Sequence, residues 1–303
     1  MIQATRRHFA EGLLAVVCSA MLMAANSAAA GPEIRYPGNY YGRVDLPLPQ
    51  SLGHLEKLIG DTDNFEPIKN FSANNRYRIA AKPIGRLDLL LGKGGKRVVS
   101  VCTGWLISDD LMVTNHHCIP GKGEDGFEVI SASLLMNYLQ EGDTGGVERF
   151  KVDLRPIETD RALDYTIVRL GGNPGRKYGT VPLGARDPEG REELFIIQHP
   201  AGKAKRLTRR NCRADKATER PEEIRHFCDT LGGSSGAPVF SDNDMALVGL
   251  HFAGIQDQVN FAKRMTAILA RSKIMSRLLG AAAPPPPSSS PPAAGEGGWQ
   301  AVQ

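Results

Sequence analysis

The sequence predicts an all-β fold that ends in one C-terminal α-helix. Short apolar runs alternate with clusters of Gly, Asp and Asn, a pattern typical of a β-sandwich or β-barrel. The runs lie at residues 87–91, 98–107, 111–114, 150–154, 165–170, 194–198, 237–240 and 246–252. Near the C-terminus the spacing becomes helical, at Met265, Ile268, Leu269, Met275, Leu278 and Leu279. Such a stripe predicts a helix packed on the core; a membrane-surface helix is the alternative.

The composition is that of a folded soluble protein. The chain has 303 residues, of which 41% are hydrophobic and 23% are charged, which excludes a wholly disordered chain and a multi-span membrane protein. The formal net charge is only +4. Residues 203–216 depart from this balance, with seven basic residues and one acidic residue. They form either an anion-binding face or a solvated strand and loop, and without interleaved aromatic residues they do not predict nucleic-acid binding.

The first 30 residues have the pattern of a signal peptide. Arg6 and Arg7 precede a mostly apolar run at 12–23, and small residues follow up to Ala30. The run is shorter than the roughly 20 apolar residues that cross a bilayer, so we expect no stable membrane insertion. The sequence therefore predicts a secreted or periplasmic protein.

Two further segments flank the predicted domain. Residues 31–75 are rich in Pro, Gly, Asn and Asp, with one short helical candidate at 51–59, and are interpreted as an N-terminal extension or a pro-segment. Residues 281–303 form a Pro/Ser-rich tail that cannot bury enough apolar surface to fold, so we expect disorder there. Residues 76–280 remain as the folded domain.

Four cysteines follow the predicted signal peptide. Two disulfides are the simplest interpretation for an exported chain, and four cysteines allow three pairings. The two local pairings, Cys102 with Cys118 and Cys212 with Cys228, each span 16 residues. A zinc site is the alternative, but no C-x-x-C or C-x-x-H pair occurs, so no metal site is predicted.

A glycine-flanked serine is the sharpest local signal for chemistry. Residues 231–238 read Leu-Gly-Gly-Ser-Ser-Gly-Ala-Pro. Glycines on both sides of Ser235 permit a tight turn that exposes Oγ and directs successive backbone N–H groups at one point, as an oxyanion requires. Alone, the run also fits an ordinary Gly-rich turn, because a nucleophilic serine needs a base.

Candidates for that base and for a residue that orients it lie upstream. His116 and His117 follow an apolar strand and precede Cys118, and Asp164 leads into the apolar run at 165–170. A histidine takes the serine proton while a carboxylate holds its ring. Singly, the histidines also fit a surface or metal-related pair, and Asp164 fits an ordinary residue at the start of a strand.

Together, in the order His, Asp, Ser, these segments resemble the trypsin-like serine peptidases with the chymotrypsin fold. Residues 114–118 (Thr-Asn-His-His-Cys) resemble the T-A-A-H-C motif of that family, and residues 233–238 resemble its G-D-S-G-G-P motif. Residues 101–107 resemble the strand before the histidine, and Asp164 fits the D-[IF]-A-L type of segment. The resemblance covers roughly residues 80–280.

The resemblance implies two six-stranded antiparallel β-barrels with the active site between them. It assigns His117, next to the cysteine, as the catalytic base, Asp164 as the residue that orients it, and Ser235 as the nucleophile. The backbone N–H groups of Gly233 and Ser235 would form the oxyanion hole. It also implies the disulfide between Cys102 and Cys118.

The sequence departs from the pancreatic members of the family. Ser234 stands where they carry the acidic residue that pairs with the N-terminus created by zymogen cleavage, which leaves activation by that ion pair in doubt. Most of their cysteines are also missing. In both respects, and at residues 198–200 and 249–252, the chain is more similar to the bacterial trypsin-like and glutamyl endopeptidase branch.

Two interpretations of substrate specificity remain open. On the pattern of that branch, Thr230 and His251 would line the primary pocket and hydrogen-bond a glutamate side chain. Asp229, however, lies six residues before Ser235, where trypsin carries the acid that selects Lys or Arg. His251 also fits a histidine satisfied by backbone groups inside a barrel.

The sequence therefore predicts a monomeric serine endopeptidase that acts on a protein or peptide substrate and needs no cofactor. The alternative is a catalytically latent or non-enzymatic binding module on the same fold, which uses the basic residues 203–213. An α/β-hydrolase is excluded because its nucleophile precedes its Asp and His.

Overall fold

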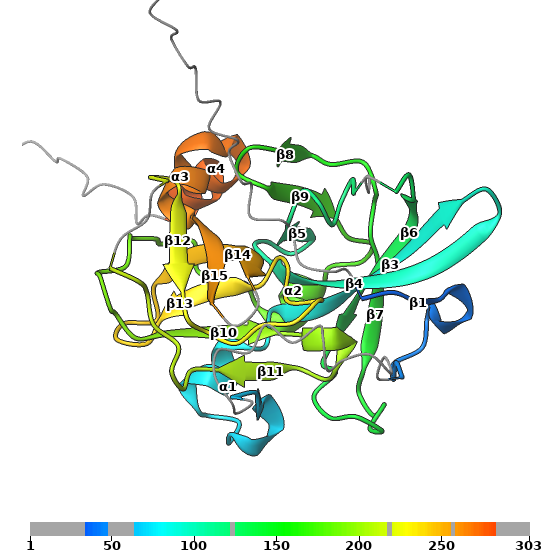
Figure 1. Cartoon of the computed structure of the whole chain (residues 1–303), viewed down its shortest axis with the longest axis horizontal. Helices are drawn as coiled ribbons and strands as arrows, with labels where there is room; N and C mark the ends of the chain where they lie inside the picture. The colour runs from blue at the N-terminus through cyan, green and yellow to red at the C-terminus, as the bar shows by residue number, and fades with distance from the viewer. Residues whose placement is uncertain (1–33, 48–63, 122–124, 217–219, 256–257, 283–303) are drawn as a thin grey trace, which may run out of the picture.

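The computed structural model describes residues 34–47, 64–121, 125–216, 220–255 and 258–282 (Figure 1). The predicted signal peptide (1–30), the helical candidate at 51–59 and nearly all of the predicted tail (281–303) lie outside the described residues. Within them the chain folds into two antiparallel sheets.

The first sheet has eight strands, in the order β7-β6-β3-β4-β5-β9-β8, with β1 paired to β4. The long hairpin of β3 and β4 lies at its centre, and every pairing is antiparallel. The strands are β1 (Tyr36–Pro37), β3 (Ile84–Lys93), β4 (Lys96–Leu106), β5 (Leu111–Thr114), β6 (Glu128–Met136), β7 (Glu148–Lys151), β8 (Glu158–Asp160) and β9 (Tyr165–Arg169).

The second sheet has seven strands, in the order β12-β15-β14-β13-β10-β11-β2. They are β2 (Glu66–Pro67), β10 (Leu194–Gln198), β11 (Arg206–Thr208), β12 (Glu223–His226), β13 (Pro238–Ser241), β14 (Leu247–Ile255) and β15 (Val259–Arg264). The predicted all-β, chymotrypsin-like fold is confirmed. The predicted number of six strands in each half is lower than the eight and seven strands observed. The difference lies partly in β1 and β2, which the segment before residue 76 adds to the first and second sheets respectively.

The helices are short and sit at the margins of the sheets. They are α1 (Arg76–Ala80), α2 (Pro174–Tyr178), α3 (Met265–Arg271) and α4 (Lys273–Ala282), with 3-10 turns at Gly38–Tyr40, Ile68–Asn70 and Pro200–Gly202. None of the helices in the described part of the chain is long and apolar enough to cross a membrane.

The predicted C-terminal helix is two helices rather than one. Ser272 interrupts it with extended backbone angles (φ −77°, ψ 118°), and its Oγ accepts the N–H of Met275 in the first turn of α4. Met265, Ile268 and Met275 are fully buried in the largest apolar cluster. Leu269 and Leu278 are partly buried against the same cluster, whereas Leu279 is 36% exposed. Most of the stripe therefore packs on the core, and in Figure 1 α3 and α4 lie together beside β8.

A buried ion pair lies within the first sheet. Arg86 on β3 is fully buried, and its Nε donates to Asp88 Oδ1 at 2.6 Å. Asp88 Oδ2 also accepts a hydrogen bond from Arg149 on β7, at 2.7 Å. The guanidinium of Arg86 lies 5.0 Å from the ring centre of Tyr138. Burial of two charges is tolerated here because each has an opposite charge and further hydrogen bonds.

Arg86 also binds the segment before residue 76. Its Nη1 donates to the carbonyl oxygens of Val44 and Gly202, both at 2.6 Å, and its Nη2 donates to that of Arg43 at 3.0 Å. Asp45 Oδ1 accepts hydrogen bonds from the Tyr138 hydroxyl and the Gly142 N–H. Residues 43–45 are thus part of the folded domain.

We expect Asp88→Asn to lower the free energy of unfolding by about 3 to 5 kcal/mol, because it leaves the buried charge of Arg86 without its counter-charge. Asp153→Asn is the matched control: Asp153 pairs with Arg155, whose side chain is 92% exposed, and such pairs contribute about 1 kcal/mol or less. Urea denaturation of the oxidised protein measures both. Equal, small losses in the two variants would show that the Arg86 network contributes little.

Candidate active site

The histidine segment begins where β5 ends. β5 pairs with β9, which places Thr114 beside the start of β9. The chain then turns, and the N–H groups of Cys118 and Ile119 both donate to the carbonyl oxygen of Asn115. The buried Asn115 side chain donates through Nδ2 to the Asp164 carbonyl oxygen at 2.8 Å. The turn is therefore held against the residue that precedes β9.

Asp164 binds His117 through both carboxylate oxygens. Oδ1 accepts the backbone N–H of His117 at 3.0 Å, and Oδ2 lies 2.8 Å from its ring Nδ1. Asp164 has a φ of 46°, a left-handed conformation that Asp tolerates better than most residues. A carboxylate on Nδ1 keeps the proton on that nitrogen and leaves Nε2 to accept another. The 33% exposure of the His117 side chain lets Nε2 reach a reacting group.

The neighbouring His116 points elsewhere. Its Nδ1 lies 2.8 Å from Thr159 Oγ1 on β8, and Thr159 Oγ1 in turn donates to the Tyr165 carbonyl oxygen at 3.0 Å. Burial lowers the pKa of His116 below its usual value. Of the two adjacent histidines, His117 is the one whose ring the structure brings to Asp164.

The Cys102–Cys118 disulfide joins β4 to the histidine turn. Its two sulfur atoms and a ring nitrogen of His117 all lie within 4.8 Å of one another. Although this is a group of potential metal ligands, both sulfur atoms are in the disulfide and offer no thiolate. The second local pair, Cys212 with Cys228, is also disulfide-bonded.

The serine loop requires its glycines. Gly233 and Gly236 have φ of 101° and 86°, values that side-chain-bearing residues rarely adopt. A Cβ on Gly236 would lie 2.2 Å from the Thr103 carbonyl oxygen, and one on Gly233 would lie 2.7 Å from that of His199. The turn therefore lies directly against neighbouring backbone.

Ser234 closes the start of this turn. It is fully buried, its N–H donates to the Leu231 carbonyl oxygen, and its Oγ accepts the Leu231 N–H, both at 3.0 Å. Ile34, from the segment before residue 76, packs against the same loop: a Cβ on Gly232 would lie 2.8 Å from its Cγ1. The position that carries an acid in pancreatic enzymes is thus satisfied locally here.

Thr103 holds the serine and histidine segments on one strand. Its N–H donates to the Ser235 carbonyl oxygen at 2.8 Å, and its Oγ1 donates to that of Gly233 at 2.9 Å. Its own carbonyl oxygen accepts Thr114 Oγ1 at 2.9 Å, just before the histidine turn. In β4, Cys102 is bonded to the histidine turn through Cys118, and the next residue, Thr103, is hydrogen-bonded to the serine loop. The two loops are therefore held by adjacent residues of one strand.

The backbone N–H groups of the serine loop differ in their hydrogen bonding. The N–H groups of Gly233 and Ser235 donate no hydrogen bond to any other residue that the structure describes. The neighbouring N–H groups of Ser234 and Gly236 do donate, to Leu231 and His251. Two unused donors beside the half-exposed Ser235 suit stabilisation of a developing oxyanion.

All three residues predicted to line the specificity pocket are buried. Asp229, Thr230 and His251 are 1%, 0% and 3% exposed. Asp229 Oδ2 accepts hydrogen bonds from both the backbone N–H and the side-chain Nδ2 of Asn64, at 3.1 and 2.8 Å. Thr230 Oγ1 donates to Asn260 Oδ1 at 2.9 Å. Nothing in the sequence pattern pointed to Asn64, 165 positions before Asp229.

His251 lies beside the serine loop and beside a second histidine. Its backbone N–H donates to the Ala237 carbonyl oxygen, and its own carbonyl oxygen accepts the N–H of Gly236. Its Nδ1 lies 3.3 Å from His226 Nε2. Burial lowers the pKa of His226 to about 3, so this ring is neutral at physiological pH.

Three of the seven basic residues at 203–216, namely Arg206, Arg209 and Arg210, are paired with carboxylates of the chain. Arg206 binds Glu141 at 2.6 Å, and Arg209 binds Glu66 at 2.8 Å. These carboxylates therefore neutralise arginines that an anion-binding face would need. Lys205 is 1% exposed, so it does not belong to a solvated strand or loop.

Comparison with known proteins identifies related chains. The chain is 32% identical over 216 residues to the secreted RxLR effector protein 73 of Plasmopara viticola; the match covers 67% of this chain and 52% of the effector. It is 22% identical over 253 residues to an extracellular metalloprotease of Bacillus subtilis, covering 80% and 79% of the two chains. The chain thus spans about half the length of the effector.

The fold also matches solved structures. A Glu endopeptidase in complex with MPD superposes with a TM-score of 0.54 at 15% sequence identity, covering 74% of this chain and 99% of that one. At this identity the likeness shows the fold alone. The family model of the trypsin-like peptidase domain matches residues 102–250, a span that holds His117, Asp164 and Ser235. Residues 102–250 of the chain thus form a trypsin-like peptidase domain.

Proposed function

We propose that the protein is a secreted or periplasmic serine endopeptidase that hydrolyses peptide bonds through an acyl-enzyme on Ser235. The observation that carries the proposal is the double contact of Asp164 with His117. Thr103 on β4 binds both the serine loop and the residue that leads into the histidine turn. A protein that only binds a partner has no need of this arrangement.

In the proposed reaction, Ser235 Oγ attacks the substrate carbonyl carbon while His117 Nε2 takes the hydroxyl proton. Asp164 holds the Nδ1–H and stabilises the imidazolium that forms. His117 then gives the proton to the leaving amine, which breaks the peptide bond and leaves the acyl group on Ser235. Water, activated by the same ring, hydrolyses this ester and regenerates the serine.

The N–H groups of Gly233 and Ser235 stabilise the tetrahedral intermediate in this proposal. They are preorganised, because the flanking N–H groups of Ser234 and Gly236 are fixed by hydrogen bonds. Loss of one such donor typically slows catalysis about 100- to 1,000-fold. The geometry of the loop thus supports acyl transfer, and the two disulfides support export to an oxidising compartment.

The non-enzymatic alternative has less support. It requires the basic residues 203–213 to face an anionic partner, but Arg206 and Arg209 bind carboxylates of the chain itself. A binding module therefore becomes one outcome of the labelling experiment below.

We expect a fluorophosphonate probe to label the purified protein on Ser235, because the probe forms a stable ester only with an activated serine. Ser235→Ala should abolish labelling without changing the circular dichroism spectrum. Mass spectrometry of the labelled peptide locates the adduct. Absence of labelling in correctly folded protein would favour a latent or non-enzymatic module.

The adjacent histidines provide a matched pair of variants. His117→Ala should lower kcat/KM for a peptide substrate by about 10⁴-fold or more, since it removes the base. His116→Ala should retain most of the activity, because its ring binds Thr159 and not Asp164. Comparable losses in the two variants would contradict the assignment of the base.

Asp229 is poorly placed to select basic side chains. It is almost fully buried and already accepts two hydrogen bonds from Asn64. A lysine or arginine of the substrate would have to displace Asn64 to reach it. We therefore propose that Asp229 holds the segment before residue 76 and that His251, beside the serine loop, contacts a side chain that accepts hydrogen bonds, such as glutamate. The Thr230 hydroxyl already donates its one proton to Asn260 and supports this region from within.

A peptide-library digest tests this specificity. We expect cleavage after Glu to exceed cleavage after Lys or Arg by at least about 10-fold, the discrimination that one unpaired buried polar group gives. Asn64→Ala should reduce the preference for Glu over Lys or Arg, because it removes the side-chain Nδ2 donor that binds Asp229. A wild-type protein that prefers Lys or Arg would show that substrate reaches Asp229.

A further inference from the structure

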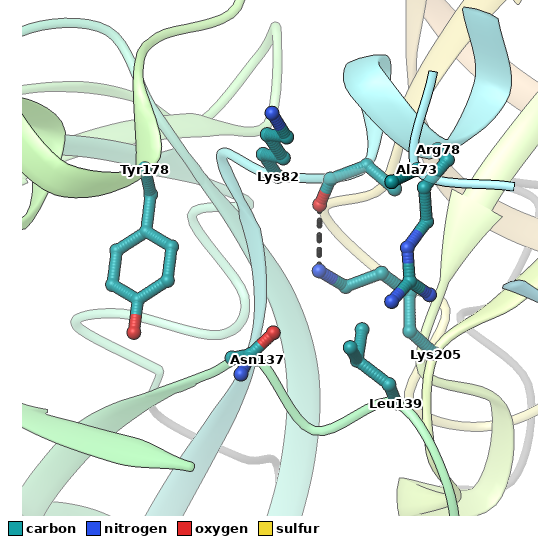
Figure 2. A pocket seen from close by; sticks show the side chains of 8 residues that line it. Ala73, Arg78, Lys82, Asn137, Leu139, Tyr178 and Lys205 are labelled. Atoms are coloured by element: carbon teal, nitrogen blue, oxygen red, sulfur yellow. Dashed lines mark hydrogen bonds between the residues drawn. The ribbon is translucent and has the colours of Figure 1, made fainter. Parts of the chain in front are cut away.

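A polar pocket lies outside the candidate active site, since none of its lining residues belongs to the histidine or serine loop. It measures about 190 Å³ and is formed by α1 and the turn after it, by residues that follow β6, by the end of α2 and by the residue before β11 (Figure 2). These elements belong to both halves of the domain. Arg78, Lys82 and Lys205 line it together with Leu139 and Tyr178, and no Asp or Glu is among the lining residues.

Lys205 is the deepest of the three cations. It is 1% exposed, and its Nζ donates to the Ala81 carbonyl oxygen at 2.6 Å, as Figure 2 shows. An ammonium group has three N–H donors, and this is the one hydrogen bond of Nζ within the described residues. Burial and the nearby charge of Arg78 lower the pKa of Lys205 to about 7.

Arg78 lacks a partner altogether in the described part of the chain. Its Nη1 is buried and has no hydrogen-bond acceptor, and no ion pair to its guanidinium occurs there. Burial alone lowers its pKa below the usual value. The guanidinium and the side chain of Lys205 lie side by side in Figure 2.

This arrangement differs from the paired arginines nearby. Arg206 and Arg209, which follow Lys205 in sequence, each bind a glutamate. Buried charges without a partner are costly, and proteins usually pair them or bind a ligand of opposite charge. A buried ammonium and a partly buried guanidinium that line one pocket without an acidic residue thus fit an anion.

We propose that this pocket binds a small tetrahedral oxyanion, phosphate or sulfate, either free or as the terminal group of a small ester. Arg78 supplies a guanidinium, the side-chain group that best suits phosphate, and Lys205 supplies an ammonium. At roughly 30 Å³ for each water molecule, the volume leaves room for a short organic group beside Leu139 and Tyr178. The anion would join α1 to the segments that contain Asn137 and Lys205.

Thermal unfolding of the purified protein at constant ionic strength tests the proposal. Phosphate and sulfate, but not chloride, should raise Tm in a saturable manner, because a ligand that binds only the folded state stabilises it. Arg78→Met and Lys205→Met should each weaken phosphate affinity at least about 10-fold, as expected for loss of a charge-assisted hydrogen bond. Arg155→Met, at an exposed arginine outside the pocket, should leave the affinity unchanged.

Lys82→Gln is a second test, because Lys82 is exposed and its loss leaves the core intact. We expect it to weaken phosphate affinity by a smaller factor. Tighter binding of glycerol phosphate than of phosphate would identify an ester as the preferred ligand, and weaker binding would identify the free anion. No saturable rise in Tm, or equal rises in the wild type and the pocket variants, would overturn the proposal.

Discussion

The hydrogen bonds of one buried guanidinium connect the parts of the molecule on which the candidate active site depends. Arg86 binds Asp88 within its own strand, the backbone at 43–44 and the carbonyl oxygen of Gly202. The 3-10 turn that contains Gly202 in turn binds the serine loop, since the Ala201 N–H donates to the Gly232 carbonyl oxygen at 2.6 Å. A single charge in the first sheet thus fixes a turn that supports the nucleophile in the second. Its burial is tolerated because Asp88 and backbone carbonyl oxygens surround it.

The segment before residue 76 behaves as part of the domain wherever the structure describes it. It adds β1 to the first sheet and β2 to the second, places Ile34 beneath the serine loop and presents Asn64 to Asp229. Its composition suggested an extension or a pro-segment, because strands of two residues leave no periodic signal. The contacts favour a structural role. Removal of this segment would take away Ile34, which packs against Gly232, and the two N–H groups of Asn64 that bind Asp229.

Features that depend on local chemistry were readable from the sequence, and those that depend on distant partners were not. The strands at 111–114 and 194–198 were predicted with their observed bounds, and the glycines around Ser235 do adopt left-handed angles. The contact between His117 and Asp164 agrees with the predicted order of residues, while their catalytic roles remain predictions. β15 was missed because its buried positions include Asn260 and Lys263, which become strand residues through pairing with β12 and β14. The burial of Lys205 was missed because its hydrogen-bond partner, the Ala81 carbonyl oxygen, lies 124 positions earlier in the chain.

Both disulfides connect cysteines 16 residues apart, and each lies in the core of a different sheet. Closing loops of about this length stabilises a protein by about 3 kcal/mol. Any other pairing would link the two sheets across at least 94 residues, the separation of Cys118 from Cys212 (212 − 118), and longer loops close at greater entropic cost. During oxidation the chain is thus biased towards its native bonds, and each half can acquire its own before the two halves dock. A newly synthesised molecule would accordingly depend little on enzymes that reshuffle mispaired cysteines.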